Sequence, residues 1–179
     1  MWKAAFGFAL AASWAVALAQ PPATTVSLKS GETAVVRIEP DGAVAVESRG
    51  PAPAMSGFEA ESLRQMAGTQ VPEGSGPLPP VAITGRKAPP VAAGRIRLTL
   101  RDVAGKTPHD TMLSVENGYG QGFRYRAVMR RGTRNAPTDV CLVLPGKPGF
   151  EHWPFQIDSI DLADLRLVPW KEGDPLPCQ

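Results

Sequence analysis

The feature that most constrains the fold of this sequence is a series of short runs in which apolar and polar residues alternate. The clearest run, Arg95–Arg101, places Ile96, Leu98 and Leu100 on one side and polar residues on the other. Alternation with a period of two is typical of a strand with one buried face. Such strands are stable only when their apolar face packs on a second layer, so we expect an all-β protein.

The N-terminal part of the chain predicts an antiparallel meander over residues 24–47. Turn residues at 30–32 and 40–42 separate three alternating runs. These runs are Thr24–Lys29, Thr33–Glu39 and Ala43–Glu47.

The main strands are expected within residues 95–170. Two runs flank the glycine-rich residues 117–122, and this arrangement predicts a hairpin. After Arg95–Arg101, the predicted strands are Thr111–Glu116, Phe123–Arg130, Thr138–Leu144, Ile157–Leu162 and Leu165–Val168. Eight or nine short strands with almost no helix indicate an antiparallel β-sandwich, formed by a single domain over residues 20–179 with a C-terminal tail at 171–179.

Residues 48–94 are rich in proline and glycine and predict a long irregular loop. One segment differs, because Ser56 and Glu59 have the spacing of a helix capping box and Gly68 can end the helix. We therefore expect a short helix over residues 57–67, docked on the sheet through Phe58, Leu63 and Met66.

The first 19 residues have the layout of a secretory signal peptide. Lys3 precedes an apolar run from Ala4 to Val16, and the sequence Ala17-Leu18-Ala19 offers small residues to a signal peptidase. The apolar run is shorter than the roughly 20 residues that a membrane-spanning helix needs. We expect a periplasmic or secreted protein that begins at Gln20 and has no stable membrane insertion.

Two cysteines, Cys141 and Cys178, are the only ones in the chain. An even number of cysteines in an oxidising compartment favours a disulfide. A zinc site is the alternative, but the only histidines, His109 and His152, lack the spacing of a zinc finger. We predict a disulfide, no metal site and no cofactor.

The charges are balanced overall but unevenly distributed. The chain has 19 Lys and Arg residues against 17 Asp and Glu residues, which argues against a nucleic-acid-binding protein. Basic residues concentrate in 94–134 and acidic residues in 135–179. The strand arginines expected on one outer surface are Arg95, Arg97, Arg101, Arg124, Arg126 and Arg130. They either pair with acidic C-terminal strands, including Asp158, Asp161 and Asp164, or form a basic face for an anionic partner.

Aromatic residues offer a second candidate binding surface. Trp153 lies in an aromatic segment, and Tyr119 lies in the predicted hairpin loop. Exposed, they would stack on a sugar or another small ligand; buried, they would fill the core.

A catalytic role for His152 is the least favoured interpretation. The chain has no G-x-S-x-G or H-E-x-x-H motif, and Glu151 and His152 would point to opposite faces of an extended segment. We expect a non-enzymatic binding or accessory protein of the cell envelope, with a partner protein first and a small-molecule or carbohydrate ligand second. The candidate binding residues are Arg97, Arg124, Arg126, Tyr119, His152 and Trp153.

The leader predicts a defined mature N-terminus. Because small residues at 17 and 19 fit the peptidase, the exported protein should begin at Gln20, partly cyclised to pyroglutamate. Intact-mass measurement checks this, and a product that keeps residues 1–19 would contradict it.

Overall fold

The structure, a computed structural model, describes residues 25–68, 92–104 and 107–178. The predicted signal peptide and residues 69–91 of the predicted loop lie outside the described residues. The described elements are β1 (Val26–Lys29), β2 (Glu32–Ile38), β3 (Val44–Pro51), α1 (Gly57–Gly68), β4 (Ile96–Val103), β5 (Asp110–Asn117), β6 (Gly122–Arg131), β7 (Arg134–Thr138), β8 (Pro148–Trp153) and β9 (Ser159–Val168).

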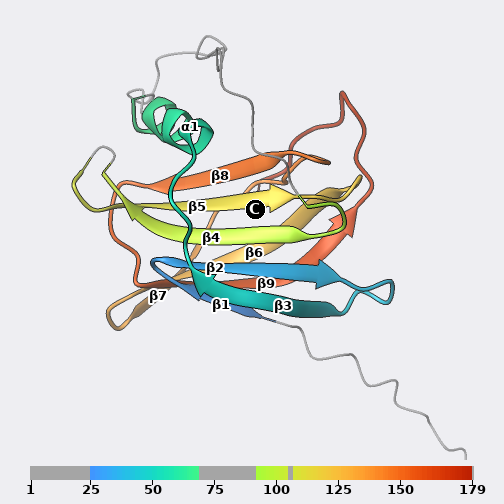
Figure 1. The fold of residues 1–179 in the computed structure, drawn as a ribbon, viewed down its shortest axis with the longest axis horizontal. Coiled ribbons are helices and arrows are strands. Elements are labelled where there is room, and N and C mark those ends of the chain that lie inside the picture. Colours follow the sequence, from blue (N-terminus) through green and yellow to red (C-terminus); the bar gives the residue numbers. More distant parts are fainter. Residues whose placement is uncertain (1–24, 69–91, 105–106, 179) are drawn as a thin grey trace, which may run out of the picture.

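The strands form two antiparallel sheets, which confirms the predicted β-sandwich (Figure 1). Sheet A has the strand order β1-β9-β6-β7, and sheet B has the order β3-β2-β4-β5-β8. Each pair of neighbouring strands is antiparallel.

The core lies between the sheets and is built by the alternation seen in the sequence. Ile96, Leu98 and Leu100 of β4 are fully buried there, and Phe123 and Tyr125 of β6 meet them from sheet A. Burying one large apolar side chain contributes about 1.5–3 kcal/mol. The alternating runs therefore supply most of the stabilisation that holds the two sheets together.

The predicted N-terminal meander is wrong in one respect. β2 and β3 pair with each other in sheet B, but β1 pairs with β9 in sheet A, with Val26 opposite Leu162. Alternation identifies the buried face of a strand, and it carries no information about which sheet receives that face. β3 also extends to Pro51, into the segment predicted as loop.

The predicted hairpin around residues 117–122 is also wrong, because β5 belongs to sheet B and β6 to sheet A. The connection is held by the buried Asn117, whose Nδ2 donates to the carbonyl oxygens of Gln121 at 2.8 Å and Leu144 at 3.0 Å. Gly118 packs against the start of β4, where a Cβ would lie 1.8 Å from the carbonyl oxygen of Ala92. The glycines thus serve a tight crossing between the sheets.

The second half of the chain differs from the prediction in three places. The predicted strand Thr138–Leu144 is an irregular segment apart from isolated bridges, and β7 ends at Thr138. Neither β7 nor β8 is among the strands predicted from the sequence. The two predicted strands at 157–168 are one strand, β9, with a bulge opposite Arg124–Arg126 and a positive φ of 53° at Asp164.

The predicted helix is confirmed as α1, and its capping box forms. The Glu59 amide donates to Ser56 Oγ at 3.2 Å, and the Ser56 amide donates to Glu59 Oε2 at 2.7 Å. The helix packs on sheet B near β8 (Figure 1). There Leu63 joins an apolar cluster with Met112 and Phe150. Only the outer face of sheet B therefore receives the helix.

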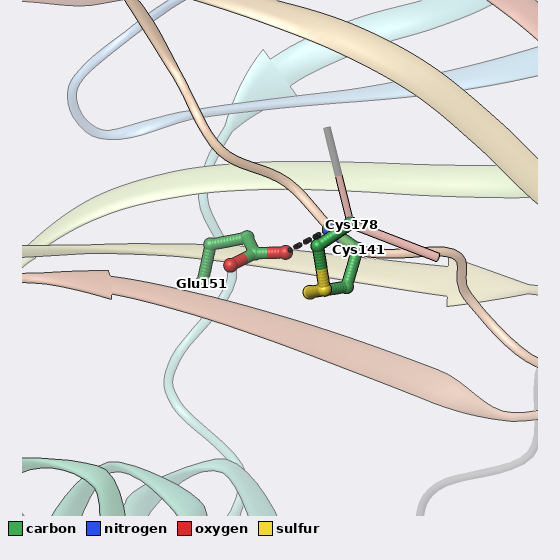
Figure 2. Close-up of a disulfide and its surroundings, with 3 residues drawn as sticks. All are labelled: Cys141, Glu151 and Cys178. Atoms are coloured by element: carbon green, nitrogen blue, oxygen red, sulfur yellow. Dashed lines mark hydrogen bonds between the residues drawn. A yellow bond between two sulfur atoms is a disulfide. The ribbon is translucent and has the colours of Figure 1, made fainter. Parts of the chain in front are cut away.

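Cys141 and Cys178 lie at disulfide distance, with their sulfur atoms 1.95 Å apart. Figure 2 shows Glu151 of β8 beside this pair, with its Oε1 accepting the Cys141 amide at 2.9 Å. The predicted tail at 171–178 is thereby tied to the irregular segment that follows β7.

Loss of the disulfide should destabilise the fold. The cysteines are 37 residues apart, and the chain-entropy model gives about 4 kcal/mol for a loop of that length. We expect the Cys141→Ser/Cys178→Ser double variant to melt at least about 5 °C lower than the native protein. Reductant should lower the melting temperature of the native protein only, and a melting temperature equal in both proteins would contradict the prediction.

Candidate functional site

The candidate arginines lie on opposite outer faces of the sandwich, so the expected single arginine surface is wrong. Arg97 belongs to β4 in sheet B, whereas Arg124 and Arg126 belong to β6 in sheet A. Arginines alternate with apolar residues on both β4 and β6, and this shared pattern predicts one common surface. The crossing at 118–121 instead places the two strands in different sheets.

On sheet B, α1 covers a buried ionic cluster. Glu59 Oε1 accepts Arg101 Nη2 at 3.0 Å and Ser114 Oγ at 3.1 Å, and Arg101 also donates to the carbonyl oxygen of Pro53. The Glu59 and Arg101 side chains are 9 % and 10 % exposed. Arg97, predicted as a binding residue, donates to Glu116 beside this cluster at 2.7 Å.

The two carboxylates of this region have pKa values displaced in opposite directions. Burial raises the pKa of Glu59, but hydrogen bonds from Ser56, the charge of Arg101 and a bond from Ser114 outweigh it and hold the pKa below 4.5. Burial raises the pKa of Glu116 and the Glu59 charge adds to this, while Arg97 opposes it. Displaced pairs of this kind occur in acid–base sites as well as in structural networks.

The space beside these carboxylates is too small for a substrate. The hollow lined by Phe58, Glu59, Ser114, Glu116, Pro148 and Phe150 has a volume of about 10 Å³. This is at the lower limit of the space that one water molecule needs. The cluster therefore holds α1 on the sheet, and the geometry gives it no access for a ligand.

His152 lies on the same outer face and is buried with a carboxylate. Its Nε2 is 2.8 Å from Asp110 Oδ2, and the two side chains are 4 % and 0 % exposed. Asp110 also accepts the Thr107 amide at 2.9 Å. This burial leaves the pair out of reach of a substrate. It therefore fits a structural role for His152 better than a catalytic role in a hydrolase.

The two candidate aromatic residues do not form an exposed platform. Trp153 is 8 % exposed, packs in the core and donates its indole N–H to Thr138 Oγ1 at 2.9 Å. The Tyr119 hydroxyl accepts the Ile38 amide at 2.8 Å, which ties the crossing at 118–121 to the end of β2. The structure thus places both in packing positions.

The outer face of sheet A is exposed and carries ion pairs between neighbouring strands. Arg126 pairs with Asp164 at 3.3 Å, and Arg130 Nε donates to Asp161 at 2.8 Å. The expected pairing between basic and acidic strands is therefore present on this sheet. Exposed pairs of this kind contribute at most about 1 kcal/mol each.

Arg166, which the sequence did not single out, lies directly opposite Arg124 in the β6–β9 ladder. Within the described residues Arg166 has no hydrogen-bond or ion-pair partner. It lines an open hollow of about 350 Å³ at one end of the sandwich, which we call the end pocket. The end pocket is lined by Ile38, Glu39, Pro40, Gly42, Gln121, Arg166 and Leu167.

Sequence reasoning missed Arg166 because an isolated arginine in an acidic segment gives no pattern. It also missed the pairing of Glu59 with Arg101. The capping box placed Glu59 at the helix start, but nothing in the sequence indicated that α1 would lie over β4. Nothing in the sequence indicated that Asp110 would be buried beside His152.

Within the described ranges, no group of three or more His, Cys, Asp or Glu side chains could hold a metal ion. The described part of the chain also has no helix with the length and hydropathy needed to cross a membrane. No family model matches this chain, and comparisons with curated proteins and with solved structures likewise give no match.

The Glu59–Arg101 pair should make stability fall in acid. The pKa of Glu59 is lower in the folded protein than its ordinary 4.5, so its contribution is fully present above pH 4.5 and is lost as pH falls through the folded pKa. We expect Glu59→Gln to lower the free energy of unfolding by about 3 kcal/mol at neutral pH, because it leaves the Arg101 charge buried without its partner.

Denaturant titrations at several pH values check this prediction. The difference between the native protein and Glu59→Gln should shrink below about pH 4.5. Glu61→Gln, on the same helix but in an exposed pair with Arg64, is the matched control and should change stability by less than about 0.5 kcal/mol. A Glu59→Gln difference that stays constant from neutral to acidic pH would contradict the linkage.

Proposed function

We propose that this protein is an exported accessory protein of the cell envelope that binds an acidic partner protein through the outer face of sheet A. The leader-like N-terminus supports export, and the cysteine pair at disulfide distance fits an oxidising compartment.

One observation carries the proposal: sheet A keeps an exposed outer face with more cations than anions. The cations of this face are Lys29, Arg124, Arg126, Arg130 and Arg166, and its anions are Asp161 and Asp164. Arg124 and Arg166 lie opposite each other in the β6–β9 ladder, so the positive charge is concentrated at one end of this face. Such a concentration of positive charge favours an acidic partner.

The other two functional hypotheses receive less support from the geometry. A carbohydrate-binding module would need exposed rings, and Trp153 is in the core while Tyr119 is bonded to β2. A hydrolase would need an accessible His152, and its side chain is 4 % exposed. The overall charge of +2 does not favour nucleic acid as the anionic partner.

Charge reversal on sheet A tests the proposal. A tagged copy carrying Arg124→Glu and Arg166→Glu should lose at least about 90 % of its crosslinked adducts in intact cells, because the face would repel an acidic partner. Its melting temperature should stay within about 2 °C, since exposed substitutions usually change stability by no more than about 0.5 kcal/mol.

The matched control is Arg134→Glu, an exposed arginine at the start of β7. It pairs in the ladder with Arg131, seven residues along β6 from Arg124, a span of about 23 Å. This variant should keep its adducts. Equal adduct yields from all three proteins, or a loss that follows the melting temperature, would refute the proposed function.

A further inference from the structure

The C-terminal half of β9 has a strand on only one of its two sides. β6 pairs along the whole of β9, but β1 reaches only Leu162, where it faces Val26. The bulge at Asp164 follows immediately, and a bulge bends a strand and increases its twist. Within the described residues, the side of β9 that faces away from β6 therefore has no partner strand over residues 163–168. We call this the β9 half-edge.

Two of the other sheet edges, those of β1 and β7, are protected. Arg49 on β3 donates to the carbonyl oxygen of Ser27, which covers the edge of β1, and the Lys29 amide donates to Glu32. β7 contains Pro137. Charged side chains, prolines and covering groups are the devices by which proteins prevent unwanted pairing at sheet edges.

The irregular segment after β7 also contacts β8. The Cys141 amide donates to Glu151 there, and Gly149 approaches Val143 so closely that a Cβ would lie 2.8 Å from Val143 Cγ2. The irregular segment after β7 thus packs on the core-facing side of β8, and through Val143 it bridges to Phe123 of β6.

The side chains around the β9 half-edge differ on its two faces. Leu165 and Leu167 point toward the core, and Leu167 lines the end pocket together with Ile38 of β2. Arg166 points to the outer face of sheet A, opposite Arg124. A strand added here would place alternate side chains in the end pocket and the others beside two arginines.

We infer that the β9 half-edge takes an extended segment of the partner protein as an additional antiparallel strand, with apolar side chains in the end pocket and acidic side chains against Arg166. This inference rests on the proposed function. Strand addition gives affinity through main-chain hydrogen bonds and specificity through alternate side chains.

The charge of the site and its volume specify the occupant. Arg166 has no partner within the described residues, so a carboxylate placed opposite it gains a charge-assisted hydrogen bond without breaking an existing ion pair. The end pocket, at about 350 Å³, has room for aliphatic side chains beside Ile38 and Leu167. The residues that precede Thr25 in this chain are a poorer match, because Pro21 and Pro22 have no N–H to donate.

The probe is a fluorescein-labelled peptide of about eight residues in which valine and glutamate alternate, titrated with the full exported protein and followed by anisotropy. A peptide of the same composition with the valines and glutamates in separate blocks serves as the sequence control. We expect saturable binding of the alternating peptide, at least about tenfold tighter than that of the block peptide. Arg166→Glu should weaken binding about tenfold or more, and Arg134→Glu should leave it unchanged.

Backbone pairing is tested with an alternating peptide whose valine amides are N-methylated and a second whose glutamate amides are N-methylated. Only one of these sets of N–H groups can face β9, so one methylated peptide should lose binding and the other should keep most of it. If both methylated peptides bind like the parent peptide but Arg166→Glu still weakens their binding, strand addition is wrong. The proposed binding of an acidic partner to the outer face of sheet A is then still supported. If Arg166→Glu does not change the affinity for the alternating peptide, the inference that the site binds an acidic segment is wrong. If the probe binds only after removal of residues 20–24, the half-edge belongs to this chain's own N-terminal segment and the inference is overturned.

Discussion

The arrangement of the two outer faces of the sandwich depends on the contacts of the Glu59 carboxylate. One of its oxygens completes the capping box with Ser56, and the other accepts Arg101 and Ser114 of sheet B. The same group therefore starts α1 and fixes where it docks. Because α1 covers part of the outer face of sheet B, the Glu59–Arg101 pair is buried, while the ion pairs of sheet A remain in water. The asymmetry between a partly covered face and an open face follows from these contacts.

Local features of the sequence predicted local structure well. The alternation at 95–101, the capping box at 56–59 and the even number of cysteines each correspond to a structural element, because each depends on residues close in sequence or on a count. The partition into sheets could not be predicted in this way. Alternation in β1 and β2 is the same whether the two strands share a sheet or not, and the side chain that separates β5 from β6, Asn117, gives no pattern in the sequence.

The candidate site was predictable only in part. The arginine stripe of β6 was correctly assigned to one outer face, and its pairing with the acidic strand β9 was among the stated alternatives. Arg97 was placed on the wrong surface because its sheet was unknown. Trp153 and His152 were candidates because tryptophan and histidine often occur in binding and catalytic sites. Their burial decides against such a role here. Their side chains bond to Thr138 and Asp110, and these long-range contacts could not be predicted from the sequence.

The pairing of the first described strand with the last has a consequence for the order of folding. Ser27 of β1 bonds to Asp161 of β9 across 134 residues of chain, and β9 is the strand that joins β1 to β6. Contacts of such large sequence separation form slowly, because the chain entropy lost in closing the loop precedes the gain from pairing. Sheet A therefore cannot assemble until nearly the whole chain is present. All five strands of sheet B precede β9 in the chain, so the core between the two sheets closes only after β9 has been synthesised.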